Sequence, residues 1–222
     1  MKFNSLNIIS KNFSFFVLAF SSLSFFVLNV ALKDNLSAIN YGLFSIFITY
    51  ISLLSSFGMF GFEQTLLRTT LIKNKLEIQK NILYPSLIAI FISSFIGVFL
   101  MKSNYDISIS YILFYLLSII VIVTKLSFNL YRLLSKFFLA QLALNFWKIA
   151  LTFVILYYVF LNNNFSLEFI FSLVLVFFAF STLSLFGLIN KIKFIKQDSF
   201  SSLFKKSFLF FISLLTISLL GF

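Results

Sequence analysis

The sequence predicts an all-α integral membrane protein with six transmembrane helices and the start of a seventh. Of its 222 residues, 61% are hydrophobic and only 10% are charged, whereas a soluble domain carries about 25% charged residues. Six apolar segments are each long enough to cross a bilayer. The basic residues between these segments fall almost entirely on alternate connections, which is the pattern of a multi-pass membrane protein.

The apolar segments divide the chain in order. They are Phe13–Leu32, Tyr41–Phe62, Ile82–Met101, Ile107–Thr124, Phe137–Leu161 and Phe169–Ile189, and a seventh runs from Ser207 to Phe222. The first follows two lysines, as in a signal peptide, but its length and the lack of a small-residue cleavage site indicate a retained helix. We therefore expect residues 1–200 to form a six-helix lobe and residues 201–222 to begin helix seven of a longer protein.

The positions of the basic residues predict the orientation. Fourteen of the 17 Lys and Arg residues lie on the side of the N-terminus, two lie on the other side, and Lys148 lies within a helix. The positive-inside rule then places the N-terminus in the cytoplasm. Topology thus explains the net charge of +11 without a nucleic-acid partner.

Two basic connections on that side carry further expectations. The stretch Glu63–Asn81 is either a solvated loop or a short interfacial helix with its cationic side towards lipid headgroups. Lys125, Asn129, Arg132 and Lys136 keep helical spacing, so the fourth helix could continue past the membrane with a basic face.

The second apolar segment carries a polar face. Its members, spaced four, three and four residues apart, are Ser45, Thr49, Ser52 and Ser56. This spacing places them on one side of a helix, where they either line a polar cavity or pack against other helices. Near the end of the segment, Gly58 and Gly61 either permit close helix packing or form a hinge.

The fifth segment carries a second polar face with a charge. It consists of Gln141, Asn145, Lys148 and Thr152. Lys148 lies eleven residues after Phe137, hence ~16 Å along the helix and near the bilayer midplane. An ammonium there costs ~2.5–3.5 kcal/mol on insertion scales, so it should face a polar cavity or an anionic partner.

No acidic residue of this sequence is placed to pair with Lys148. The six acids are Asp34, Glu63, Glu77, Asp106, Glu168 and Asp198, all in predicted loops or helix ends. The counter-charge must come from a further part of the protein, another subunit or an anionic substrate. Alternatively, Lys148 is structural and extends its ammonium towards the interface, or the helix boundary is misplaced.

Several function classes are disfavoured by what the sequence lacks. It contains no Cys and no His, which removes thiol nucleophiles, histidine bases and nearly all zinc chemistry. It has no paired carboxylates, no glycine-rich phosphate loop and no HExxH motif, so we expect no catalysis, no metal and no cofactor.

One stretch resembles a known family. The string YGLFSIFITYISLLSSFGMFGFEQTLLR, from Tyr41 to Arg68, is similar to the second helix and following loop of bacterial polysaccharide flippases. These are the O-antigen (Wzx-type) members of the multidrug/oligosaccharidyl-lipid/polysaccharide exporter superfamily. The similar features are the Tyr-Gly start and the exit with Gly61, Glu63, Leu66 and Arg68.

The resemblance implies a fold and a function. The fold is two six-helix lobes around a cationic cavity that opens alternately to each side, and this chain would be the first lobe. The substrate would be an oligosaccharide on undecaprenyl diphosphate, such as an O-antigen or capsule unit, moved from the cytoplasmic to the periplasmic leaflet of the bacterial inner membrane. The partners would be membrane lipids, the C-terminal lobe and the polysaccharide polymerase machinery.

The resemblance also assigns roles to residues. Lys148 would bind the diphosphate or an acidic sugar, and Asn145 and Gln141 would bind sugar hydroxyls. Glu63 and Arg68 would fix the cytoplasmic gate or the helix ends, without touching the substrate. Three alternatives remain: a drug/cation antiporter of the same superfamily, a membrane polysaccharide polymerase, and a half-protein that transports nothing.

Overall fold

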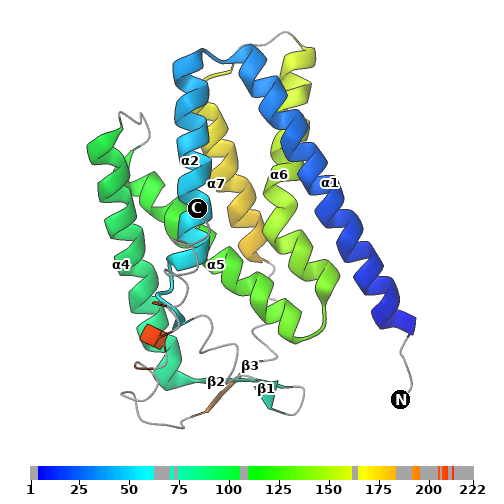
Figure 1. Cartoon of the computed structure of the whole chain (residues 1–222), viewed down its shortest axis with the longest axis vertical. Coiled ribbons are helices and arrows are strands. Elements are labelled where there is room, and N and C mark those ends of the chain that lie inside the picture. Colours follow the sequence, from blue (N-terminus) through cyan, green and yellow to red (C-terminus); the bar gives the residue numbers. More distant parts are fainter. Residues whose placement is uncertain are drawn as a thin grey trace.

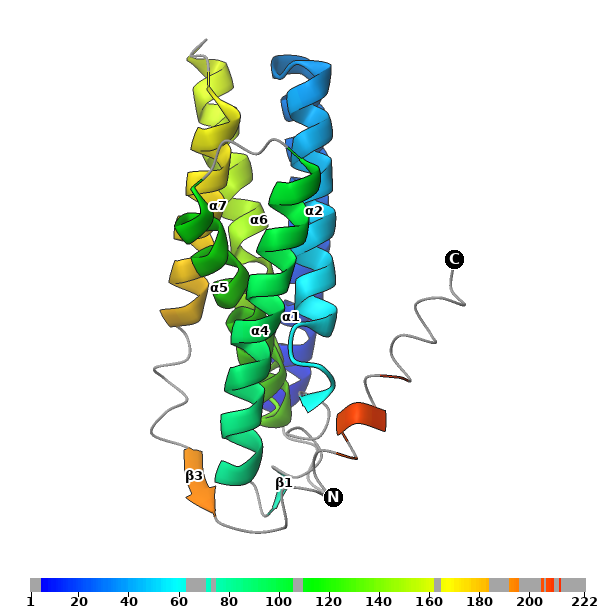
Figure 2. The same ribbon diagram turned by 90° about the vertical axis from the view of Figure 1, so that its left-hand side faces the viewer.

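The computed structural model shows a helical bundle with a small sheet at one end (Figures 1 and 2). It describes residues 5–62, 71–72, 75–105, 110–161, 165–183, 192–195, 205, 207–209 and 212. The helices are α1 (Ser5–Asn35), α2 (Ala38–Phe57), α4 (Lys80–Asn104), α5 (Tyr111–Leu133), α6 (Phe137–Phe160) and α7 (Leu167–Leu183). The strands are β1 (Leu71–Ile72), β2 (Lys75–Gln79) and β3 (Ile192–Ile195).

The helical class predicted from the sequence is confirmed. Each of the six apolar segments overlaps one helix, and α1, α2, α4, α5 and α6 are long and apolar enough to span a membrane. The helix α7 is shorter, with 17 described residues. The lengths and the apolar composition of these helices are therefore those of a multi-pass membrane protein. The predicted seventh segment lies mostly outside the described residues.

Consecutive helices run in alternate directions (Figure 1). The strands and the turn between α5 and α6 lie at one end of the bundle, here called the sheet end, and the turn between α1 and α2 lies at the far end. Ser37 begins α2 there, since its side chain accepts a hydrogen bond from the backbone N–H of Asn40 at 3.3 Å, which satisfies one unpaired donor of the first turn.

The helices pack as one bundle, in which α5 and α6 also contact each other. The helix α1 packs mainly on α6, and α2 packs on α4 and α5, while α7 packs against both α5 and α6. Three aromatic pairs join α1 to α6, with ring centroids 6.0–6.4 Å apart: Phe13–Phe138, Phe20–Phe153 and Phe25–Trp147. The helices α1 and α2 diverge from the far end towards the sheet end (Figure 1).

The α2 helix ends earlier than its apolar run. The run was expected to be helical to Phe62, but α2 ends at Phe57 and Gly58 is its C-cap. The chain then turns, with Phe60 and Gly61 at positive φ angles of 46° and 77°, a conformation that favours glycine.

Neither alternative for Glu63–Asn81, a solvated loop or an interfacial helix, describes residues 71–72 and 75–79. Residues 71–72 and 75–79 form β1 and β2, which pair antiparallel, and β2 pairs parallel with β3. The physical reason lies in the sequence of β2: in KLEIQ apolar residues alternate with polar or charged ones, which favours a strand.

The α5 helix extends beyond its predicted apolar segment, as its basic spacing indicated. It continues through Lys125 and Arg132 and ends at Leu133. Lys136 lies outside it, as the N-cap residue of α6. Lys125 is consequently about eight residues, or ~12 Å, from the sheet end of its helix, and not in a connection.

Candidate functional site

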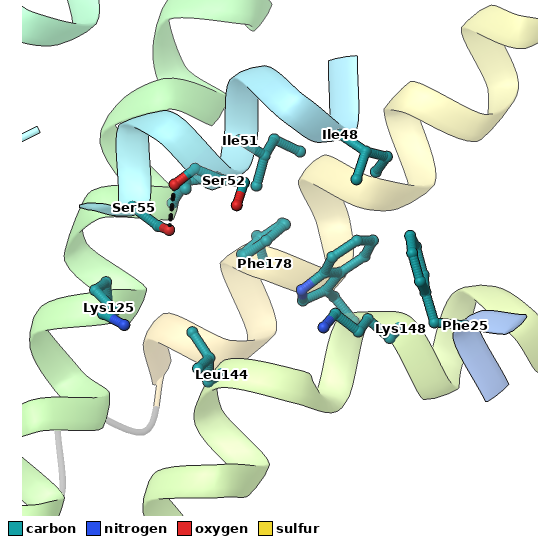
Figure 3. A pocket seen from close by; sticks show the side chains of 11 residues that line it. Phe25, Ile48, Ile51, Ser52, Ser55, Lys125, Leu144, Lys148 and Phe178 are labelled. Carbon is teal, nitrogen blue, oxygen red and sulfur yellow. Dashed lines mark hydrogen bonds between the residues drawn. The ribbon is translucent and has the colours of Figure 1, made fainter. Parts of the chain in front are cut away.

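A cavity of about 350 Å³ lies between α2 and α6 (Figure 3). One wall is the last half of α2, the opposite wall is the middle of α6, and α1, α5 and α7 complete the lining. The lining residues are Phe25, Ile48, Ile51, Ser52, Ser55, Val121, Lys125, Leu144, Trp147, Lys148 and Phe178.

Two lysines from different helices line this cavity. Lys148 is the twelfth of the 24 residues of α6, and Lys125 comes from the second half of α5. Both side chains line the same cavity, and in Figure 3 they lie apart along it with Leu144 between them. No carboxylate belongs to the described residues that line it, so the cavity carries a local excess of positive charge.

Aromatic rings surround the Lys148 side chain. Its Nζ lies 5.4 Å from the ring centroid of Phe25 and 5.9 Å from that of Trp147, within the range of cation–π attraction. Trp147 is itself held by stacking on Phe178 at 5.1 Å. Among the described residues, these ring contacts are the ones the structure gives the ammonium.

The α2 wall supplies hydroxyl groups. Ser52 lines the cavity, and the Ser55 hydroxyl donates a hydrogen bond to the Ser52 backbone carbonyl at 2.8 Å (Figure 3). A hydroxyl that donates in this way keeps its oxygen lone pairs free to accept. The cavity thus combines two cations, two hydroxyls and an apolar aromatic lining, which suits an anionic group attached to an apolar body.

Only one residue of the predicted polar face of α2 lines the cavity. Ser52 is in the lining, while Ser45, Thr49 and Ser56 are exposed on the same side of the helix but outside the lining. Each of these three hydroxyls donates to the backbone carbonyl four residues earlier, at 3.0 Å. Their hydrogen-bond donors are satisfied within α2.

The predicted polar face of α6 is divided in a similar way. Lys148 reaches the cavity, whereas Thr152 is 4% exposed and donates hydrogen bonds to the backbone carbonyls of Lys148 at 2.7 Å and of Ser24 in α1 at 2.9 Å. Asn145 is 3% exposed and donates to the side chain of Gln141 at 2.8 Å. In this structure Thr152 therefore fastens α6 to α1, and the two amides bind each other.

Of the four residues predicted to form a gate or to be structural, the structure describes two. Gly58 lies against α5, because a Cβ built there would be 2.6 Å from Cγ1 of Ile122. Gly61 lies in the turn after α2. Glu63 and Arg68 lie outside the described residues.

Sequence reasoning missed Lys125, Ser55 and the aromatic lining as site residues. Lys125 was assigned to the basic connection because the apolar run ends at Thr124. Its helical spacing to Arg132 was the signal that α5 continues. The aromatic residues carried no usable signal, since the sequence contains 36 Phe.

No family model, curated protein or solved structure matches this chain. The class of multi-pass helical membrane protein therefore rests on the helices themselves, and the function rests on the chemistry of the cavity.

Proposed function

We propose that the chain is one lobe of a flippase-type transporter. In this proposal it binds undecaprenyl-diphosphate-linked oligosaccharide in the cavity between α2 and α6. It crosses the bacterial inner membrane six times with a cytoplasmic N-terminus, and it acts with a second lobe to move its substrate to the periplasmic leaflet. The observation that carries the proposal is the pair Lys125 and Lys148 in a cavity whose described lining holds no carboxylate.

The sign of the charge favours an anionic ligand. A lysine at mid-helix in a membrane costs about 2.5–3.5 kcal/mol, and two in one cavity also repel each other. A bound phosphate or diphosphate would offset both costs through charge-assisted hydrogen bonds. A drug/cation antiporter would instead need a carboxylate to hold its cation, so the charge of the cavity disfavours that alternative.

The size of the cavity fits part of a large amphiphile. A volume of about 350 Å³ is at the lower end of ligand pockets, which span roughly 300–1,000 Å³. It would hold a diphosphate with its first sugar, and the rest of the substrate would extend beyond this lobe. The resemblance of Tyr41–Arg68 to polysaccharide flippases supports the same substrate.

Binding to the purified full chain tests the ligand. Undecaprenyl diphosphate should bind in detergent micelles, and undecaprenol, which has the same tail without phosphate, should not. Lys148→Met and Lys125→Met should each weaken binding about tenfold or more, since a charge-assisted hydrogen bond contributes ~1.5–3 kcal/mol. Lys33→Met is the matched control, because Lys33 is exposed near the far end of α1. Equal binding of the two lipids would refute the proposal.

Surface polysaccharide in cells tests the transport step. Lys148→Ala in the full-length protein should abolish its display at a normal protein level, and Lys148→Arg should distinguish the need for charge from the need for shape. Wild-type display by the Lys148→Ala variant would contradict the assignment.

A further inference from the structure

The three-stranded sheet at the sheet end has one wholly apolar face. Residues that are partners in the register of β1 with β2, or of β2 with β3, share a face of the sheet, and successive residues of a strand alternate between the two faces. The register therefore gives one face five residues, all apolar: Leu71, Leu76, Ile78, Ile192 and Phe194. An apolar face of this size needs a partner that excludes water.

The opposite face carries the charged residues of the strands. Lys75 and Glu77 of β2 share this face, and Lys193 of β3 is the register partner of Glu77. The strands with the residues next to them, 71–80 and 191–196, contain six lysines and one acidic residue. This local excess of positive charge favours an anionic partner.

The described helices leave the sheet mostly to another partner. The strands lie at the end of the bundle, beside the start of α4 (Figures 1 and 2). Of the described helices, α4 contacts the sheet most, and α4 follows β2 directly in the chain. Contacts between the sheet and the other described helices are minor.

The α4 helix gives the level of the sheet relative to a bilayer. From Leu87 to Leu100, every exposed side chain of α4 is Leu, Ile or Phe, as on a surface that faces hydrocarbon. Tyr84 and Tyr105 are exposed at the two ends of this surface, and tyrosine is enriched at membrane–water interfaces. The two tyrosines are 21 residues apart, ~31 Å along a helix, which matches a hydrocarbon core of ~30 Å.

The end of β2 then lies in the layer of lipid headgroups. The strand ends at Gln79, and α4 begins at Lys80, four residues before Tyr84. The end of β2 is therefore ~6 Å outside the hydrocarbon, and the headgroup layer is roughly 5–7 Å thick on each side. At this level the apolar face of a sheet is within reach of acyl chains, and its lysines are within reach of phosphates.

We propose that the three-stranded sheet is a membrane-surface platform that binds anionic phospholipids of the leaflet on its side. The apolar face lies against the acyl chains, and the lysines of the strands and their flanks bind the lipid phosphates. The strands supply the order of these groups, so that the platform depends on where the lysines lie and not only on their number. The inference concerns the outer surface of the protein and holds whichever ligand the cavity binds.

Spin labels on β2 test the two faces, because the sequence contains no cysteine. Leu76→Cys and Ile78→Cys place a label on the apolar face, and Glu77→Cys places one on the opposite face. In vesicles of phosphatidylcholine and phosphatidylglycerol, the labels at 76 and 78 should collide with dissolved oxygen, and the label at 77 with a water-soluble nickel complex. Equal collision of all three labels with the nickel complex would overturn the proposal. Shielding of the labels at 76 and 78 from both reagents would also overturn it, because protein would then cover the apolar face.

Removing a lysine tests the preference for anionic lipid. Phosphatidylglycerol with brominated chains is titrated into phosphatidylcholine nanodiscs that hold the full chain, and the readout is quenching of a fluorophore on Ile78→Cys. Lys193→Gln should raise the fraction of brominated lipid at half-maximal quenching about fivefold, since one lysine near the surface contributes about that factor. Lys193→Arg keeps the charge and should leave the titration unchanged.

Two controls separate the sheet from the total charge of the protein. Lys33→Gln removes a charge near the far end, and Lys136→Gln removes one from the sheet end but outside the strands. Both should leave the titration unchanged. An equal shift in Lys136→Gln and Lys193→Gln would refute the platform, because the attraction would then follow the total charge of that end. An unchanged titration in Lys193→Gln would refute it as well.

Discussion

Replacing Lys148 by methionine should stabilise the folded protein or leave its stability unchanged. Methionine keeps the length of the side chain and removes its charge. A lysine at the centre of a membrane helix costs about 2.5–3.5 kcal/mol. The described contacts that offset this cost are the two rings 5.4 and 5.9 Å from Nζ, worth ~0.5–1 kcal/mol each.

The cost of the buried lysine exceeds the cation–π attraction that offsets it, and water in the cavity reduces that excess. Lys148→Met should therefore raise the free energy of unfolding by about 1 kcal/mol. The assay is reversible unfolding in mixed detergent micelles without added lipid ligand, with the exposed Lys33→Met as control. A loss of about 1 kcal/mol or more would refute the reasoning, because it would show that Lys148 is paired with an acid and is structural.

Other substitutions test the packing around the site by the same unfolding assay. Gly58→Ala should lower the free energy of unfolding by about 1–3 kcal/mol, because the added Cβ would lie 2.6 Å from a side chain of α5. Gly42→Ala is the control: nothing lies within 4 Å of the added atom, so it should be neutral or stabilising. Tyr50→Phe and Ser118→Ala should each lower the free energy of unfolding by about 1 kcal/mol. The two side chains share one hydrogen bond of 2.8 Å, so the double variant should lose less than the sum of the two. Additive losses would contradict a shared bond. Thr152→Val should lower the free energy of unfolding by about 1 kcal/mol, because it removes the hydrogen bond to the backbone of α1. An unchanged free energy of unfolding would show that this bond does not hold α1 to α6.

The sequence was most informative about the helices and about one charged residue. Uncharged runs locate the helices because hydrocarbon excludes charged groups, and the same rule makes Lys148 conspicuous in the middle of an apolar segment. Lys125 was less conspicuous because it directly follows an apolar run and counts equally well as the start of a basic connection. Only the observed length of α5 places it in the cavity.

Spacing alone could not say which polar groups reach the cavity. Ser45, Ser52 and Ser56 lie on one side of α2, but only Ser52 of these three lines the cavity. The spacing fixes the side of a helix, whereas the cavity depends on how α2 crosses the other helices. The strands were missed because each is too short to predict alone, and because β2 and β3 lie far apart in the sequence.

The parallel pairing of β2 with β3 has a consequence for the order of folding. Residues 76–79 pair with residues 192–195, so β2 has its neighbour β1 early but lacks β3 until four more helices have been synthesised. At roughly 5–20 residues per second, that interval is on the order of 5–20 s. The three-stranded sheet is therefore completed only after α4, α5, α6 and α7 have been synthesised.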